Sequence, residues 1–267
     1  MRPGPADVLD ERMIRGLHVE AVRHAGLHPG HDPHVVFQTS TLDALFDGDF
    51  DGDLTFAELA EQGDLGIGTL NGLDGEMIAL DGRFLRADAG GAIAEVPDGA
   101  RTPFAVVTRF EPSVEVELEG PLDHDALVAA VDRHAPPGAP VCAVRIDGEW
   151  ERVHARSVPR QRPPYRSLTE VAHDQHVFDL DDVEGTMVGF RFPQYAQGLE
   201  VAGYHLHFVD AARERGGHVL GCRARRVTVR IDASRDLHVE LPPGVELGAP
   251  DTGPAAAARV RAVEGET

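Results

Sequence analysis

The segment from residue 199 to residue 232 contains two long runs in which apolar and polar residues alternate. It reads LEVAGYHLHFVDAARERGGHVLGCRARRVTVRID, with a polar loop between the two runs. Alternation with a period of two places successive side chains on opposite faces of a β-strand. The segment is therefore predicted to form two long strands in an antiparallel hairpin, which constrains the chain to a fold with a substantial sheet.

Short strand patterns separated by glycine and Asp-Gly turns continue through most of the chain from Val35 onward. Strands are predicted over residues 34–40, 65–70, 76–81, 83–88, 102–112, 141–158 and 184–193, with hairpin turns at Asp81-Gly82 and Asp147-Gly148. The two Asp-Gly phrases resemble each other, so a duplicated unit is left open. Helices are predicted over residues 40–46, 53–64 and 122–135, the second with a capping box of Thr55 and Glu58. This mixture predicts an α+β fold with antiparallel or mixed sheets.

We expect three parts along the chain. They are an N-terminal appendage (residues 1–34), an α+β domain (35–165) and a second α+β domain (166–267) that carries the metal site and a C-terminal tail rich in Pro, Gly and Ala. The appendage is predicted to contain a helix over residues 6–25. Breakers such as Gly30 separate its four histidines, so we interpret these as a solvated tail and not as a metal cluster. These histidines are His24, His28, His31 and His34.

The charge of the chain limits its partners. The net charge is -20, and all 25 basic residues are arginine. Such a surface repels nucleic acid and anionic membranes. A salt-rich cytoplasm and a GC-rich genome both explain the lack of lysine, and both explanations stay open.

No apolar run approaches the roughly 18 residues of a membrane span, and the N-terminus lacks the apolar run of a secretory signal, so we expect a cytoplasmic protein. Cys142 and Cys222 lie in apolar runs and are expected to be reduced.

Residues 47–58, DGDFDGDLTFAE, match the ligand spacing of an EF-hand calcium loop. The apolar stretch before them, residues 41–46, is too short for the entering helix, and the chain has no second loop of this kind. Glu58 is also explained as part of a helix cap. We therefore interpret the segment as a connection between two helices and not as a calcium site.

Three histidines in the long hairpin are the strongest candidates for a metal site. His205 and His207 stand two apart in the first strand, so their imidazoles project from one face about 7 Å apart along the chain. His218 follows Gly216 and Gly217 at the start of the returning strand, where an antiparallel hairpin can bring it to the first pair. Three neutral imidazoles with a fourth position open suit a catalytic zinc or a similar divalent ion. Hydrogen-bonded structural histidines remain the alternative.

The sequence resembles the acetolactate decarboxylase family from about Val35 to the C-terminus. Several blocks carry the resemblance in order: FQTSTLDALFDGDFDGDLTFAEL, GDLGIGTLNGLDGEMIALDG, RSVPRQRPPY, GTMVGFRFPQYAQGLEVAGYHLHF and GGHVLG. The resemblance implies two sheet-containing domains, a homodimer, and a zinc-dependent lyase that converts 2-acetolactate to acetoin and CO2.

The resemblance also assigns active-site residues. The zinc histidines of the family correspond to His205, His207 and His218, the three that the strand pattern selects. Its other active-site residues correspond to Thr69, Glu76, Arg156 and Glu264. Two departures stand out: residues 1–34 have no counterpart, and residues 200–203 read Glu-Val-Ala-Gly where the family pattern has Asn-Val-Pro-Gly. The second departure implies a different loop beside the metal.

The chemistry explains why such residues are needed. Loss of CO2 from 2-acetolactate leaves an electron pair that flows into the neighbouring ketone as an enediolate. Zinc held by neutral imidazoles keeps its full charge and stabilises the ketone and hydroxyl oxygens, so no organic cofactor is expected. Arg156 suits the substrate carboxylate, and Glu76 or Glu264 is expected to protonate the enediolate. Without the resemblance, Glu76 and Arg156 would be interpreted as surface residues.

Two other functions fit the metal site. One is a zinc lyase or hydrolase that acts on another small keto acid. The other is a non-enzymatic metal-binding module, because a DNA-associated domain family carries a similar His-x-His and Gly-Gly-His pattern. The net charge of -20 disfavours that module, since binding to phosphate needs a basic face. We therefore expect a small-molecule substrate, with neither nucleic acid nor membrane as a partner.

Overall fold

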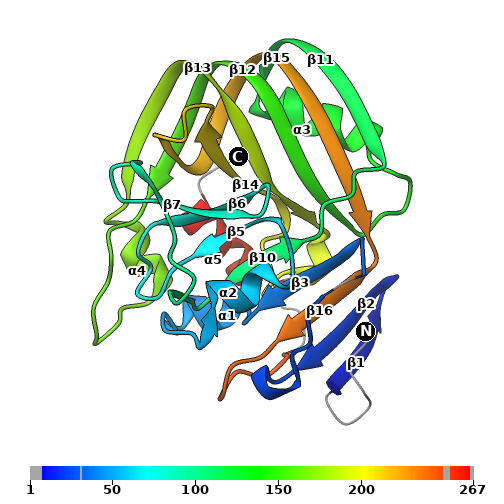
Figure 1. Cartoon of the computed structure of the whole chain (residues 1–267), viewed down its shortest axis with the longest axis vertical. Coiled ribbons are helices and arrows are strands. Elements are labelled where there is room, and N and C mark those ends of the chain that lie inside the picture. The colour runs from blue at the N-terminus through cyan, green and yellow to red at the C-terminus, as the bar shows by residue number, and fades with distance from the viewer. Residues whose placement is uncertain (1–7, 31, 249–252, 265–267) are drawn as a thin grey trace.

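The structure is a computed structural model, and it describes residues 8–30, 32–248 and 253–264. Two large sheets lie one above the other in Figure 1, with short helices around them. The fold is α+β, as the sequence predicts. No helix among the described residues is long and apolar enough to cross a membrane.

The lower sheet has nine strands. β16 runs parallel to its neighbours β2 and β3, and all other neighbours are antiparallel. The order across the sheet is β1 (Val8–Ile14), β2 (Leu17–Val22), β16 (Asp236–Glu240), β3 (Val35–Thr39), β10 (Ala105–Thr108), β5 (Leu65–Thr69), β6 (Glu76–Leu80), β7 (Arg83–Ala87) and β8 (Ile93–Glu95).

The upper sheet has five antiparallel strands. Their order is β11 (Val114–Asp123), β15 (Gly216–Ser234), β12 (Val141–Ser157), β13 (His176–Phe192) and β14 (Gly203–Asp210). β14 pairs in addition with the first residues of β15, so β12, β13, β14 and β15 form a closed ring of paired strands. The predicted hairpin is confirmed where β14 meets the start of β15, at three residue pairs, whereas the rest of β15 pairs with β11 and β12. A small third sheet pairs β4 (Leu54–Thr55) with β9 (Arg101–Thr102).

The described residues form five α-helices and two 3-10 turns. They are α1 (Leu42–Phe46), α2 (Phe56–Ala60), α3 (His124–His134), α4 (Leu168–Ala172) and α5 (Pro254–Glu264), with η1 (His24–Gly26) and η2 (Gln194–Ala196). The first three confirm the predicted helices, and the capping box of Thr55 and Glu58 begins α2. α4 and α5 were not predicted, although the run of alanines in residues 255–258 favours the helix that forms there.

One hydrophobic core joins the two sheets and the C-terminal helix. It includes Ile67 of β5, Phe190 of β13 and Val263 of α5, each buried. Figure 1 places α5 in the middle of the molecule, near β5 and β6. Both sheets therefore contribute to the same interior, and the end of the chain packs into it.

The prediction of a helix over residues 6–25 is wrong. Residues 8–22 form the hairpin of β1 and β2, and β2 is a buried strand beside β16. Arg15 and Gly16 have φ angles of 47° and 90°. This left-handed pair makes a tight hairpin turn and ends any helix. This part of the predicted appendage thus belongs to the nine-stranded sheet.

The predicted turn at Asp147-Gly148 is also wrong, because β12 continues through it. A Cβ atom on Gly148 would lie 2.2 Å from the carbonyl oxygen of Arg226. The glycine therefore permits close approach of β15 and does not mark a turn. The other Asp-Gly pair does form the predicted hairpin, between β6 and β7. The two phrases consequently do not form a duplicated unit.

The chain crosses between the sheets more than once. β11 and β12 lie before residue 165 but belong to the upper sheet, and β16 returns to the lower sheet. A boundary at residues 165 and 166 does not coincide with the division between the sheets. The division into domains stays a prediction.

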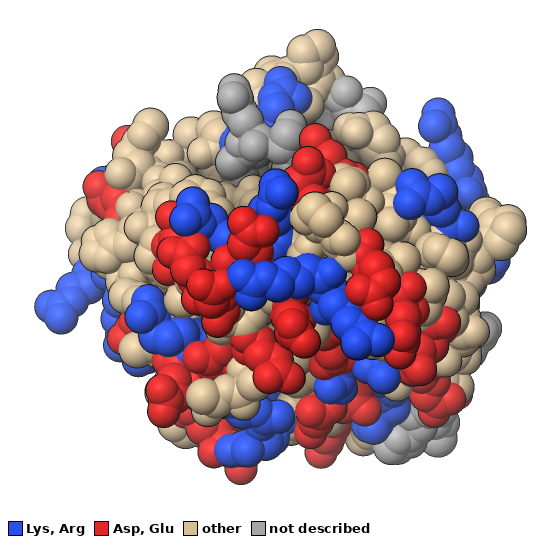
Figure 2. Space-filling view, turned by 90° about the horizontal axis from the view of Figure 1, so that it is seen from above, with Lys and Arg blue, Asp and Glu red and all other residues tan. Residues whose placement is uncertain are grey.

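Ion pairs are frequent on the exposed strands of the upper sheet. Acidic and arginine side chains are interleaved on the face that Figure 2 shows. Exposed pairs of this kind are screened by solvent and add little to stability, but together they distribute both signs of charge over the strands of the upper sheet. The pairs include Arg152–Asp181, Arg223–Glu151, Arg225–Asp182, Arg226–Glu119 and Arg230–Glu115.

His18 connects the N-terminal hairpin to β16. Its Nδ1 lies 2.9 Å from Asp236, and its Nε2 lies 3.1 Å from Glu11. The hydrogen bond with Asp236 raises the pKa of His18 above its usual value. The stabilisation that this charge gives is therefore complete below the unfolded-state pKa of about 6.5 and is lost as pH rises through the higher folded-state value.

We expect His18→Ala to lower the free energy of unfolding by about 0.5 kcal/mol more at pH 5.5 than at pH 9. Urea unfolding at the two pH values measures this difference. The exposed His176→Ala should show no such dependence. Equal losses for His18→Ala at both pH values would show that the His18 charge does not stabilise the hairpin.

Candidate active site

The strand register brings three predicted site residues into one row. Arg156 of β12 pairs with His218 of β15, and His218 pairs with His207 of β14. His205 lies two residues before His207, on the same face of β14. Neighbouring strands thus bring together residues that are far apart in the sequence.

The three histidines form a group that could hold a metal ion. One ring nitrogen from each of His205, His207 and His218 lies within 4.8 Å of the others, and all three residues are buried. The ring centroids are 5.0 to 5.4 Å apart. Among the described residues this is the group that meets these distances. The candidate metal site is therefore the one that the sequence predicts.

The hydrogen bond of His207 fixes which of its nitrogens can bind a metal. Nδ1 lies 2.8 Å from the carbonyl oxygen of Met77, which can only accept, so Nδ1 carries the hydrogen. Nε2 is buried and has no hydrogen-bond partner among the described residues. Burial lowers the pKa of His207 well below its usual value, and His205 adds to this effect. His207 therefore stays neutral and presents a bare lone pair, which is what a metal ligand requires.

Glu76 and Arg156 form a buried ion pair beside the histidines. An Arg156 guanidinium nitrogen donates to Glu76 Oε1 at 2.8 Å, and both side chains are less than 10% exposed. The second carboxylate oxygen of Glu76 lies 3.6 Å from Nε2 of His207, beyond hydrogen-bond distance. The carboxylate therefore stands between the guanidinium and the imidazole.

Thr69 is the neighbour of Glu76 across strands β5 and β6. Its hydroxyl donates a hydrogen bond of 2.8 Å to the carbonyl oxygen of Gly75, the residue before Glu76. This bond fixes the turn from which Glu76 enters β6. In this structure Thr69 thus supports the position of the carboxylate.

A largely apolar cavity lies between the two sheets and reaches these residues. Its position beside both the ion pair and the imidazoles makes it the candidate substrate pocket. The cavity is lined by Leu42, Leu45, Gly68, Thr69, Leu73, Glu76, Phe104, Arg156, Val158, Leu168, Ala172, His205, His207 and Val263. His218 instead lines a second pocket, together with Tyr204 and Arg261.

Glu264 is the last residue of α5. Its neighbour Val263 lines the cavity, so the end of this helix reaches the candidate site. The side chain of Glu264 lies outside the described residues.

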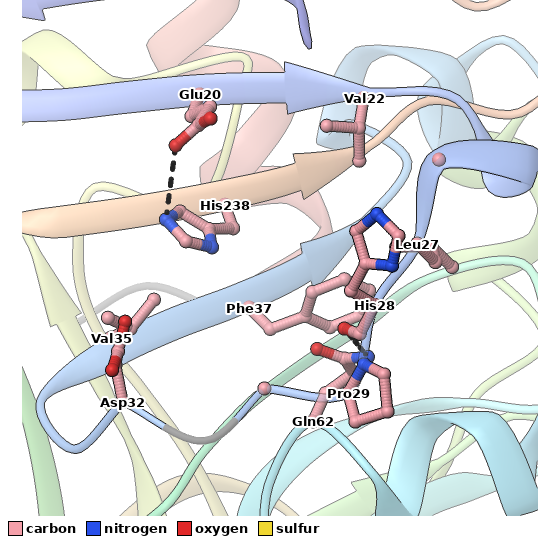
Figure 3. Close-up of a pocket in the computed structure, with 12 residues that line it drawn as sticks. Glu20, Val22, Leu27, His28, Pro29, Asp32, Val35, Phe37, Gln62 and His238 are labelled. Carbon is pink, nitrogen blue, oxygen red and sulfur yellow. Dashed lines mark hydrogen bonds and ion pairs between the residues drawn. The ribbon is translucent and has the colours of Figure 1, made fainter. Parts of the chain in front are cut away.

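The N-terminal histidines do not converge on one point. His24 lies 3.4 Å from Glu58, and His34 lies 2.5 Å from Asp232. His28 lines a separate pocket beside β2, β3 and β16, where Glu20 and His238 point toward each other at 3.5 Å (Figure 3). His31 lies outside the described residues. Residues 28, 29 and 32–34 are exposed, whereas residues 8–22 of the predicted appendage belong to the nine-stranded sheet. The histidines make no metal cluster among the described residues.

The aspartate loop before α2 makes contacts typical of a structural connection. Asp51 accepts a hydrogen bond from the hydroxyl of Tyr165 at 2.9 Å, and Asp53 lies 3.4 Å from Arg101. Among the described residues, no three acidic or histidine side chains of this loop form a group close enough to hold an ion.

Both cysteines are free thiols, Cys142 buried and Cys222 partly buried, and burial raises the pKa of each.

The fold and the site together define a class of protein. It is an α+β enzyme whose buried cavity combines a group able to hold a metal ion with a carboxylate and a guanidinium. Residues 36–248 match the model of a family described as alpha-acetolactate decarboxylase. The chain belongs to this family.

Individual relatives agree with this assignment. The alpha-acetolactate decarboxylase of Methylococcus capsulatus is 46% identical over 235 residues, which cover 88% of this chain and 90% of the relative. That of Klebsiella aerogenes is 40% identical and covers 81% and 84%. The crystal structure of alpha-acetolactate decarboxylase from Bacillus subtilis matches with a TM-score of 0.81 and 36% identity, over 87% of this chain and all of that one. This membership favours an enzyme over the DNA-associated module.

Two contacts at the site were not predicted from the sequence. Met77 orients His207 through a main-chain carbonyl, and Glu200 Oε1 lies 3.3 Å from Nδ1 of His205. The contact between Met77 and His207 uses a backbone carbonyl, so no pattern of side chains in the sequence predicts it. The contact of Glu200 with His205 could have been suspected from the sequence, because Glu200 is one of the residues in the stretch 200–203 that depart from the family pattern.

Proposed function

We propose that the protein is a zinc-dependent enzyme that decarboxylates 2-acetolactate to acetoin and CO2. The observation that carries this proposal is the convergence of three buried imidazoles beside the Glu76–Arg156 pair in a chain of this family. The bare Nε2 of His207 fits a cation, and an all-imidazole ligand set suits zinc. Such an ion supplies positive charge for the ketone and hydroxyl oxygens of the substrate.

Arg156 is proposed to hold the substrate carboxylate. Its planar guanidinium forms strong charge-assisted hydrogen bonds with carboxylates, as the bond with Glu76 illustrates. A carboxylate held there faces the apolar side of the cavity. When CO2 leaves, the electron pair stays on the substrate as the enediolate, so the negative charge passes from the carboxylate to oxygens that a bound cation would stabilise.

Glu76 is proposed to deliver the proton to the enediolate, once the substrate carboxylate has replaced it on Arg156 and the freed carboxyl group has taken up a proton. It lies beside both Arg156 and His207, within reach of a substrate that contacts both. Thr69 supports it through the turn at Gly75. Glu264 remains the second candidate, since α5 reaches the cavity at the adjacent residue.

The partners, the location and the oligomeric state of the protein are also proposed here. The net charge of -20 supports a small-molecule substrate and opposes binding to nucleic acid or to an anionic membrane. A homodimer is proposed from the resemblance. A cytoplasmic location is proposed because the sequence has no apolar run that approaches the length of a membrane span.

Metal removal tests the proposed function directly. Dialysis against a chelator is expected to abolish acetoin formation from racemic 2-acetolactate, and one equivalent of zinc should restore it. Elemental analysis of the purified protein gives the metal content in parallel. Activity that persists without metal would overturn zinc dependence. A zinc protein that forms no acetoin would favour the alternative, a lyase or hydrolase for another small keto acid.

A further inference from the structure

Glu200 is a buried carboxylate with few polar neighbours. It is 1% exposed and lies between η2 and β14. Its Oε1 lies 3.0 Å from the amide nitrogen of Val201 and 3.3 Å from Nδ1 of His205. Its Oε2 is buried and has no hydrogen-bond partner among the described residues. A carboxylate in such surroundings is costly unless a nearby positive charge balances it.

The contact between the Glu200 carboxylate and Nδ1 of His205 indicates a role for the negative charge. An ionised carboxylate only accepts hydrogen bonds, so Nδ1 of His205 carries the hydrogen. The other ring nitrogen then presents its lone pair to the group that His207 and His218 complete. We propose that Glu200 is a positioning residue of the metal site: it orients His205, fixes its tautomer and strengthens metal binding by its charge. This inference rests on the proposed function.

The backbone around Glu200 is held in place from the other sheet. The carbonyl oxygen of Leu199 accepts hydrogen bonds from the backbone amide of Leu42 at 3.0 Å and from the side chain of Gln38 at 2.7 Å. The carbonyl oxygen of Gly198 accepts one from the amide of Asp43 at 2.9 Å. The carboxylate is therefore presented to His205 from a segment that β3 and α1 fix. Little conformational freedom remains to be lost when the imidazole binds a metal.

The two histidines of β14 are supported in different ways. His207 donates to a neutral carbonyl, that of Met77, whereas His205 donates to a carboxylate. A carboxylate partner makes an imidazole a stronger donor to a metal, and removal of such a partner typically weakens metal affinity by about 10- to 100-fold. The negative charge also offsets part of the charge that the ion brings into a buried site.

Glu200→Gln isolates the charge, because the amide oxygen can still accept from His205 and Val201. We expect the zinc dissociation constant of the full chain to rise about tenfold, and that of Glu200→Ala to rise toward about 100-fold. Competition with a chromophoric chelator measures both, and Co2+ absorption reports the ligand field independently of activity. Glu214→Gln, which removes an exposed charge from the turn between β14 and β15, is the matched control and should match the original protein.

The outcomes separate this inference from the proposed function. A Glu200→Gln protein that folds and binds zinc within twofold of the original would overturn the role of Glu200. An original chain that binds no zinc would overturn the proposed function instead. If Glu200→Gln does not fold, Glu200→Asp decides: it keeps the charge but withdraws it by one methylene, and an unchanged zinc affinity and Co2+ spectrum would likewise overturn the role.

Discussion

Glu76→Gln is expected to retain its metal and to lose turnover by a factor on the order of 10²–10⁴, the contribution typical of a positioned general acid. Glutamine keeps the size of the side chain and an oxygen that can accept from Arg156, as Glu76 Oε1 does at 2.8 Å. It cannot carry the transferable proton. The variant therefore removes the proposed chemistry and leaves the surrounding contacts largely intact.

Steady-state acetoin formation, measured on protein with its zinc content determined, checks this expectation. Glu117→Gln removes a carboxylate from the exposed surface of β11 and serves as the control, with activity near that of the original. Full activity of Glu76→Gln would exclude Glu76 as the proton donor. Comparison with Glu264→Gln then shows whether the end of α5 supplies the proton.

The metal group could be predicted from the sequence because its members lie in one local motif. The alternation around His205 and His207 defines a shared face, and the double glycine before His218 marks the returning strand. The observed pairing of His207 with His218 follows from that hairpin. In contrast, Glu76 and Arg156 are 80 residues apart and meet only through the packing of two sheets. Only the resemblance indicated them, and their roles remain proposals.

The errors of the sequence analysis have physical causes in tertiary structure. The segment LHVEAV is compatible with a helix or a strand, and pairing of β2 with β16, more than 200 residues later, determines the result. The pair Asp147-Gly148 is typical of a hairpin turn, but Gly148 lies within β12, where the close approach of β15 requires a residue without a side chain. Glu200 is a departure from the family pattern in a loop, but the role proposed for it depends on the direction in which its carboxylate points, which the sequence alone does not reveal.

His207→Ala is expected to reduce bound zinc to well below one equivalent and to abolish acetoin formation. The imidazole is 1% exposed, and its hydrogen bond to Met77 aims Nε2 into the group of three. Two histidines alone provide an incomplete set for a zinc ion, which structural and catalytic sites bind through at least three protein ligands.

The loss of a buried side chain also lowers stability, so circular dichroism and thermal unfolding must show that His207→Ala is folded. His176→Ala, at an exposed position of β13, serves as the control and should retain both metal and activity. One equivalent of tightly bound zinc in folded His207→Ala would place the ion elsewhere, and the roles proposed for Glu76 and Glu200 would then lose their common basis. Loss of zinc in this variant, together with retention of zinc in Glu76→Gln, would separate the residues that hold the ion from the residue that transfers the proton.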